Sequence, residues 1–219
     1  MDSSFVTLIL TSTWETIQMT VISTFVSYVI GIPLGILLYV TSKEGTHPNF
    51  VINFIAGLIT NVLRSVPFLI LLVAILPFTR LVAGTTLGTT ATIVPLIVAA
   101  SPYVARMVES SLKEVDTGVV EAAQAMGAST GQIITKVFLP EARPSLLVGA
   151  AISLATILGY SAMAGFVGGG GLGAVAINYG YYRYQTDVMM ITVLLLVVIV
   201  QIFQEGGLLL ARKTDKRLK

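Results

Sequence analysis

Long apolar segments separated by short polar stretches constrain this chain more than any other feature of its sequence. A membrane-spanning helix needs about 20 apolar residues at a rise of about 1.5 Å each. Five segments meet this requirement: residues 16–40, 50–78, 89–105, 145–167 and 188–211. A backbone in lipid must satisfy its own hydrogen bonds, so the sequence predicts an all-α, polytopic integral membrane protein with five transmembrane helices.

Composition agrees with this class. Charged residues make up 11% of the 219 positions, against about 25% in soluble domains. The length predicts one transmembrane domain over residues 1–219. The chain has no cysteine, which excludes disulfides and cysteine-based metal sites. The first 15 residues, mostly Ser, Thr and apolar residues, are expected to form a partly ordered terminus.

The second apolar segment is unusual because Arg64 and Pro67 interrupt it. It is too long for a perpendicular span, so it must tilt, kink or begin along the membrane interface. Pro67 is expected to supply a kink by clashing with the carbonyl of Leu63. A charge at the bilayer centre costs at least ~2.5 kcal/mol, so Arg64 should face protein, a water-filled cavity or the cytoplasmic interface.

The distribution of Lys and Arg predicts the orientation. Ten of them lie on one side of the predicted spans, whereas only Arg80 and Arg183 lie on the other. The ten are Lys43, Arg106, Lys113, Lys136, Arg143, Arg212, Lys213, Lys216, Arg217 and Lys219. Because cytoplasmic loops carry the basic excess, the N-terminus is expected outside and the C-terminus and the loop 106–144 in the cytoplasm.

The predicted cytoplasmic loop contains the signature of two short helices around a turn. Asp116 or Thr117 can cap a helix that runs through about Met126, and Gly127 suits the left-handed position that follows a helix. Ser129 and Gln132 have the spacing of a capping box for a second helix.

The second helix is expected to be amphipathic and to be limited by Pro140. Gln132 and Lys136 point away from its apolar face. That face comprises Ile133, Ile134, Val137 and Phe138.

Three interpretations of this helical loop compete. It could simply connect two spans, or it could be a DNA-binding helix-turn-helix. The second is disfavoured because residues 106–144 hold four Lys or Arg against five acidic residues, and phosphate binding needs a basic surface. The third interpretation is a rigid element that a cytoplasmic partner grips.

The third interpretation gains support from a family resemblance. Glu121-Ala122-Ala123, three residues, Gly127, nine residues, Val137, one residue, Leu139 and Pro140 resemble the EAA loop of permease subunits of bacterial ABC importers. The resemblance implies that this loop docks a cytoplasmic ATPase. The implied docking residues are Glu121, Ala122, Ala123, Gly127, Ile133, Val137, Leu139 and Pro140.

A second resemblance narrows the substrate. The segment Gly159–Met189 resembles the methionine-import permeases of the same family. So do WETIQMT near the N-terminus, GIPLGILLYVT at the end of the first span and RSVPFLILL in the second. This implies a homodimer in the bacterial inner membrane, two copies of an ATPase that binds ATP and Mg, and an external substrate-binding lipoprotein that delivers methionine. The chain itself would need no cofactor, metal or nucleic acid. Tyr160, Ser161 and Met163 are placed at the translocation path or its gate.

Other groups allow more than one interpretation. Gly168, Gly170 and Gly173 match the dinucleotide pattern G-x-G-x-x-G, but a membrane span precedes them where that site needs a strand, and no Walker A pattern occurs. The glycine run is either a flexible external turn or a place of close backbone approach between copies or against a partner.

The tyrosine-rich segment and the single histidine also need an interpretation. The tyrosines of residues 179–184, with Arg183 among them, are typical of a membrane–water boundary, with contact to an external partner as the alternative. His47 is expected to be solvated and isolated from metal ligands.

Alternatives to methionine import remain at this point. The permease could carry another amino acid, or the chain could be an ion-coupled secondary transporter or a passive channel. Ion coupling usually relies on intramembrane acids or broken helices. The first, third and fourth predicted spans contain no acidic residue, which favours a pore powered by a partner.

Overall fold

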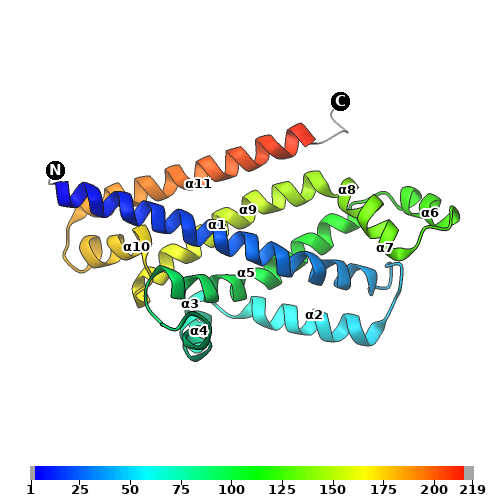
Figure 1. Ribbon diagram of the computed structural model, residues 1–219, viewed down its shortest axis with the longest axis horizontal. Helices are drawn as coiled ribbons and strands as arrows, with labels where there is room; N and C mark the ends of the chain where they lie inside the picture. Colours follow the sequence, from blue (N-terminus) through cyan, green and yellow to red (C-terminus); the bar gives the residue numbers. More distant parts are fainter. Residues whose placement is uncertain (1–2, 215–219) are drawn as a thin grey trace.

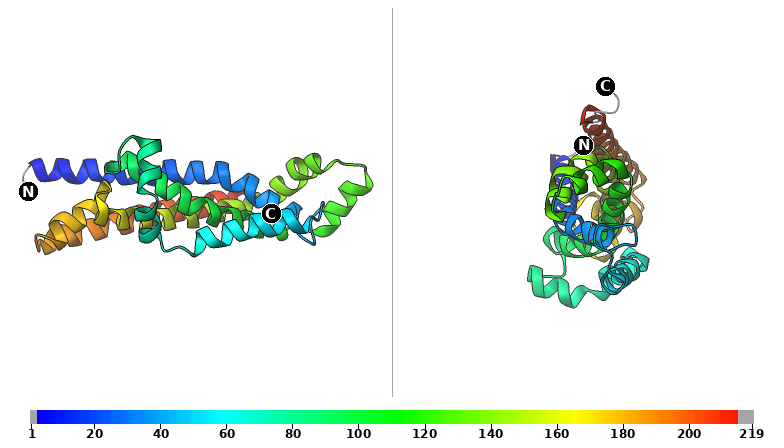
Figure 2. Two further views of the ribbon diagram at one scale, coloured as in Figure 1. Left: turned by 90° about the horizontal axis from the view of Figure 1, so that it is seen from below. Right: turned by 90° about the vertical axis from the view of Figure 1, so that its right-hand side faces the viewer.

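The structure is an elongated bundle of helices. The computed structural model describes residues 3–214, and every regular element in that range is helical, as the sequence predicts. Four long helices follow the long axis of the molecule, as two views show (Figures 1 and 2). They are α1 (Ser3–Val40), α5 (Gly88–Lys113), α9 (Arg143–Ala164) and α11 (Thr186–Thr214). The basic residues Lys216, Arg217 and Lys219, which contribute to the predicted orientation, lie outside the described residues.

The first helix is longer than predicted. α1 begins at Ser3 rather than near Thr16, so the expectation of a partly ordered terminus is wrong for the described residues. The hydroxyls of Thr7 and Thr13 donate to carbonyl oxygens four residues earlier, which accommodates these polar side chains within the helix. No glycine or proline occurs before Gly31, and the helix therefore continues without a break.

The second predicted span is not one helix. It is divided into α2 (Phe50–Ser65), α3 (Phe68–Ala74) and α4 (Leu76–Ala83), and α2 and α3 are bent by 102°. Val66 is extended because the ring of Pro67 disfavours helical backbone at the preceding residue. The sequence locates the interruption correctly, and its form is a sharp break between two helices.

The number of spans is therefore four or five. In residues 3–214, four helical segments are long and apolar enough to cross a membrane: α1, α5, residues 143–181 and α11. The bent pair α2–α3 provides a fifth only if it is counted as one broken span.

The third and fourth predicted spans also have different boundaries in the structure. α5 continues to Lys113, past the predicted end at residue 105, because Val104, Val108 and Leu112 keep a buried apolar stripe at helical spacing. The fourth span starts at Arg143 in α9, and the short 3₁₀ helix η2 (Gly165–Val167) follows it.

Small residues let α1 and α5 approach closely at the centre of the bundle. A Cβ atom on Gly31 would lie 2.5 Å from Val104 Cγ1, and one on Gly35 would lie 2.6 Å from the carbonyl oxygen of Ala105. Such close backbone packing through glycines four residues apart is common between membrane helices. Further along, Met19, Leu96 and Ile157 join α1, α5 and α9 in a second buried cluster.

Candidate functional site

Residues 116–142 form a helical projection at one end of the bundle, called the knob below (Figure 1). It contains α6 (Thr117–Ala125), α7 (Thr130–Ile133), the π-helical segment η1 (Ile134–Phe138) and α8 (Leu139–Glu141). The connection between α1 and α2 lies at the same end of the molecule.

Local interactions define both ends of α6. The carboxylate of Asp116 accepts a hydrogen bond from the backbone N–H of Gly118 at 2.7 Å. At the other end Gly127 has φ 78°, and its N–H and that of Ala128 donate back to the last turn of the helix. This pair of bonds is a Schellman motif, which requires a left-handed residue after the cap. The predicted cap at Asp116 and turn at Gly127 are confirmed.

The second helix of the knob begins with the predicted capping box. The hydroxyl of Ser129 accepts from the N–H of Gln132, and the side-chain oxygen of Gln132 accepts from the N–H of Ser129 at 2.8 Å. The prediction that Pro140 limits the helix is wrong, because α8 continues to Glu141. Pro140 lies in the first turn of α8, directly after the wider π-helical turn, where its missing N–H is tolerated.

The inner face of the knob is packed against the bundle. Ala123, Ile133 and Phe138 are buried in a cluster with Tyr39 from α1 and Leu112 from α5. The rings of Tyr39 and Phe138 meet edge to face with centroids 4.9 Å apart. The knob is therefore anchored to the ends of α1 and α5, and rigid movement of the knob would displace both helices.

Other residues of the knob are exposed. The candidate docking residues divide between the two faces: Glu121, Ala122, Gly127 and Pro140 are exposed, whereas Ala123, Ile133, Val137 and Leu139 are partly or fully buried. The sequence analysis missed Met126, whose surface is 81% exposed at the tip of the turn. Its position directly before the turn glycine could have indicated this exposure.

His47 makes one contact that the sequence did not predict. It is exposed, as expected of a solvated residue, but its ring nitrogen Nε2 is hydrogen-bonded to the hydroxyl of Thr130 in the first turn of α7. The bond joins the connection between α1 and α2 to the knob across 83 residues of sequence.

The three candidate path residues lie in different environments. Tyr160 is half-buried, and its ring stacks on Phe68 of α3 with centroids 4.7 Å apart. Ser161 is buried, and its hydroxyl donates to the carbonyl of Leu158. The side chain of Met163 is 44% exposed on α9. The structure thus leaves Met163 and part of Tyr160 accessible, whereas Ser161 is enclosed within the subunit.

The glycine run lies at the end of the molecule opposite the knob, where it packs within the chain. It leads into α10 (Gly171–Val175) and the π-helical segment η3 (Ala176–Tyr181). A Cβ atom on Gly165 would meet the backbone of Gly173, and one on Gly173 would meet the backbone of Ala162, so neither position has room for a side chain. Close backbone approach is therefore present here, between segments of one subunit.

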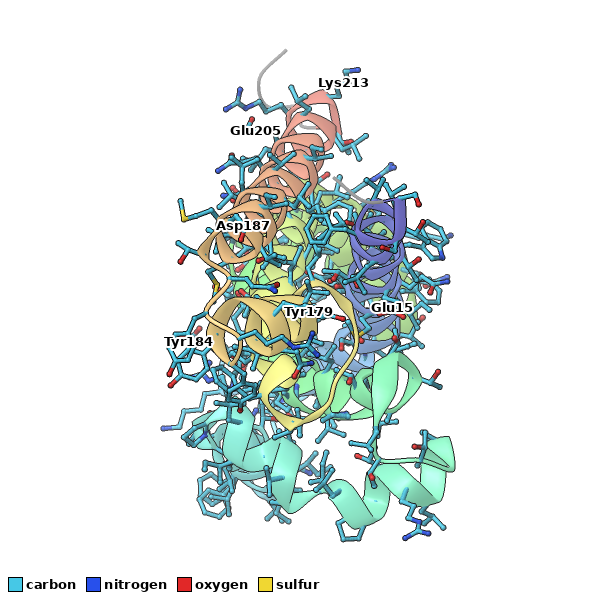
Figure 3. All side chains as sticks on the ribbon, turned by 90° about the vertical axis from the view of Figure 1, so that its left-hand side faces the viewer. Glu15, Tyr179, Tyr184, Asp187, Glu205 and Lys213 are labelled. Carbon is cyan, nitrogen blue, oxygen red and sulfur yellow. The ribbon has the colours of Figure 1, made fainter. Side chains whose placement is uncertain are left out.

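The side chains of α1 hold the start of α10. Glu15 accepts from the N–H of Gly171 at 2.7 Å, and the hydroxyl of Thr16 accepts from the N–H of Leu172 at 2.8 Å. Figure 3 looks onto this end, where Glu15 and Tyr179 border one pocket. The segment before Gly168 is helical, so the strand that a dinucleotide fingerprint requires is missing from its place.

Aromatic side chains extend outward beside this pocket. Tyr181, Tyr182 and Tyr184 are exposed, and Tyr184 reaches 88% with a left-handed backbone of φ 57°. The guanidinium of Arg183 lies 4.4 Å from the ring centroid of Tyr179, a cation–π contact. The result is a surface on which aromatic rings and a positive charge are presented together.

A charged network that the sequence analysis did not identify attaches α2 to α5. Arg106 donates to Glu109 at 2.6 Å, to Asn61 of α2 at 2.9 Å and to the carbonyl of Gly57 at 3.2 Å. Lys113 donates to the other oxygen of Glu109 at 2.9 Å. Arg64, by contrast, is exposed in the last turn of α2. Within residues 3–214 no cluster of three or more His, Asp or Glu side chains could hold a metal ion.

Comparison with known proteins defines the family. A model of the binding-protein-dependent transport system inner membrane components matches residues 31–215. The chain belongs to this family. The resemblance to importer permeases in the sequence is therefore confirmed, and the knob holds the residues that resemble their EAA loop.

Close relatives of this permease share most of its length. The Vibrio cholerae protein named "Probable D-methionine transport system permease protein MetI" is 54% identical over 210 residues, covering 96% of this chain and 93% of that protein. The D-methionine transport system permease protein MetI of Escherichia coli strain K12 is 48% identical over 165 residues, covering 75% of this chain and 76% of that protein.

Solved structures agree with the fold. A chain of the MetNI methionine ABC transporter, in an inward-facing conformation, is 46% identical and matches with a TM-score of 0.96 over 99% of this chain and all of that chain (100%). An amino acid ABC transporter solved with histidines matches with a TM-score of 0.79 at 20% identity over 96% of this chain and 95% of that chain, which supports the shared fold alone.

Proposed function

We propose that this chain is the membrane permease subunit of an ATP-driven importer of methionine. The observation that carries the proposal is the near-complete match to methionine permeases, with a TM-score of 0.96 to a chain of the MetNI transporter. The chain provides the translocation path in the bacterial inner membrane as a single domain over residues 1–219. Methionine is the cargo, and another amino acid is the alternative within the same class.

In this proposal other subunits bind and hydrolyse ATP. Two copies of a separate cytoplasmic ATPase bind ATP and Mg and hydrolyse the nucleotide, and the permease needs no cofactor of its own. An assembly of this kind changes between inward- and outward-facing states by rigid-body movement of its helical bundles. Such movement requires a rigid connection between the ATPase and the permease.

The knob is suited to make that connection. Its exposed residues include the apolar Val119 and Met126 and the charged Glu121. Exposed apolar groups rimmed by polar ones are typical of binding surfaces. The buried side chains of Ile133 and Phe138 hold the knob to α1 and α5, so a displacement of the ATPase would reach the membrane bundle.

The translocation path lies between two copies of this chain in the proposed assembly. In this proposal Met163, which is exposed, and Tyr160, which is half-buried, face the path. A flexible, polarisable thioether suits an apolar substrate such as methionine. Ser161 is enclosed in the subunit and contributes to packing near the path.

The end opposite the knob is the external side in this proposal. Aromatic side chains at Tyr181, Tyr182 and Tyr184 offer a docking surface for the substrate-binding lipoprotein, since tyrosines are enriched at protein interfaces. The N-terminus lies on this side and the C-terminus in the cytoplasm.

The test is uptake of labelled methionine by proteoliposomes that contain this chain, its ATPase and the binding protein. Uptake should require ATP on the knob side and should be competed by unlabelled methionine but not by arginine or glutamate. ATP-driven uptake of another amino acid would replace the substrate assignment. Uptake driven by an ion gradient without ATP would assign a secondary transporter, and gradient-free leakage would assign a channel.

A further inference from the structure

The connection between α1 and α2, residues 41–49, is a compact structure and is fixed to the end of α1. His47 N–H donates to the carbonyl of Val40 at 3.0 Å, and Asn49 N–H donates to that of Thr41 at 3.0 Å. Gly45 lies so close to the backbone of Val40 that a Cβ atom would not fit. Several hydrogen bonds over so few residues leave little freedom for His47 to move independently of α1.

The same connection determines where α2 begins. The side chain of Asn49 caps α2 by accepting from Ile52 N–H at 3.0 Å. Asn53 donates to the carbonyl of Leu38 at 2.7 Å and to the hydroxyl of Thr41 at 3.1 Å. The end of α1, the connection and the first turn of α2 therefore form one hydrogen-bonded unit.

This unit contacts the knob at two points. Tyr39 packs edge to face on the buried ring of Phe138 in η1. The ring nitrogen Nε2 of His47 is hydrogen-bonded to the hydroxyl of Thr130. Thr130 directly follows Ser129, which caps α7, so the second contact holds the start of that helix. One contact is buried and apolar, and the other is polar and directional.

α2 has few other attachments that could control its position. Of its sixteen residues, all of them described, only Thr60 is buried. Arg106 of α5 binds the middle of the helix through Gly57 and Asn61. The hydrogen-bonded unit fixes its first turn, and the break at Val66 ends it. A displacement of the knob that moved His47 would consequently move the start of α2.

We propose that His47 is a positioning residue that couples the knob to α1 and α2 through its hydrogen bond with Thr130. The bond passes a displacement of α7 to the α1–α2 connection, in parallel with the apolar packing that joins the knob to the ends of α1 and α5. This inference rests on the proposed docking of the ATPase at the knob. It concerns the route of the movement and not the docking itself.

The experiment compares variants in the full transporter reconstituted with its ATPase and binding protein. His47→Ala and Thr130→Val each remove the bond, and Thr130→Val keeps the shape of the side chain. His47→Gln and Thr130→Ser retain groups able to hydrogen-bond. Lys43→Ala is the matched control, because Lys43 is exposed in the same connection and belongs to neither ion pair found in residues 3–214.

The readout is methionine transported per ATP hydrolysed. Loss of one hydrogen bond should lower this ratio by about two- to ten-fold in His47→Ala and Thr130→Val. ATPase co-purification and ATP turnover should be retained. The double variant should be no worse than either single variant, because both remove the same bond. His47→Gln, Thr130→Ser and Lys43→Ala should keep a ratio near that of the wild type.

Three results would overturn the inference. The first is an unchanged ratio of methionine transported to ATP hydrolysed in both His47→Ala and Thr130→Val. The second is additive losses in the double variant. The third is a loss of ATPase binding that accounts for the whole effect. These leave the proposed function intact if the wild type shows ATP-dependent uptake in the same vesicles. A wild type without such uptake would overturn both the proposed function and the inference.

Discussion

The turn of the knob offers a prediction whose magnitude follows from backbone geometry alone. Gly127 has φ 78°, and a Cβ atom added there would meet nothing within 4 Å. A substitution therefore introduces backbone strain without a steric clash. A left-handed conformation costs a residue with a Cβ atom ~1–2 kcal/mol, so Gly127→Ala should destabilise the knob by about that amount. Gly127→Asn should cost less, because Asn tolerates this conformation better.

Gly131 is the matched control for this prediction. A Cβ atom added to Gly131 would also meet open space, but this residue lies in the helix α7 with ordinary backbone angles. Replacing a helical glycine by alanine stabilises a helix by roughly 0.5–1 kcal/mol. The two alanine variants should thus differ by about 2 kcal/mol in the opening free energy of the knob.

Amide hydrogen exchange of residues 117–138 in detergent measures this difference. The Gly127→Ala variant should lose protection by roughly ten-fold relative to wild type, because 1.4 kcal/mol corresponds to a factor of ten. Co-purification of the ATPase should weaken in the same order of variants. Equal protection in Gly127→Ala and Gly131→Ala would show that the left-handed turn does not limit the stability of the knob.

Three further predictions address the bundle. Arg106→Ala should lower the free energy of unfolding of the permease by ~1–3 kcal/mol, because the buried carboxylate of Glu109 then keeps only Lys113 as a partner. A thermal unfolding midpoint equal to that of the wild type would contradict this. Glu15→Ala should lower the stability of the permease by ~1 kcal/mol and expose η3 to proteolysis. Glu15→Gln retains an acceptor for the start of α10 and should have a smaller effect. Equal effects of the two variants would rule out the capping role. Lys43→Cys should be protected from an impermeant thiol reagent in spheroplasts and Arg183→Cys should be labelled; the reverse pattern would invert the orientation.

Local features of the knob could be predicted because each depends on a few neighbouring residues. Asp116, the Ser129–Gln132 pair and Gly127 act through backbone groups within about one helical turn, so sequence spacing alone specifies them. Pro140 shows the limit of such reasoning. A proline usually ends a helix, but the π-helical turn before it and its place in the first turn of α8 remove the conflict.

Contacts between distant segments could not be predicted in this way. The bond of His47 to Thr130 and that of Arg106 to Asn61 depend on how α1, α2, α5 and the knob are placed together. The break at Val66 has a local cause, yet its angle of 102° depends on the packing of Phe68 and Leu72 into the bundle. The division of the candidate docking residues into exposed and buried sets likewise requires the tertiary structure.

Site-specific cross-linking tests most directly whether the knob is the docking element for the ATPase. The chain has no cysteine, so a single introduced thiol reports one position. Met126→Cys places it on the 81% exposed tip of the knob, and Tyr184→Cys places it on an 88% exposed side chain at the opposite end. A short thiol–amine cross-linker should join the Met126→Cys variant to the ATPase in the assembled transporter. It should form no cross-link between the Tyr184→Cys variant and the ATPase. Cross-linking of the ATPase at position 184 and not at 126 would contradict the proposed docking.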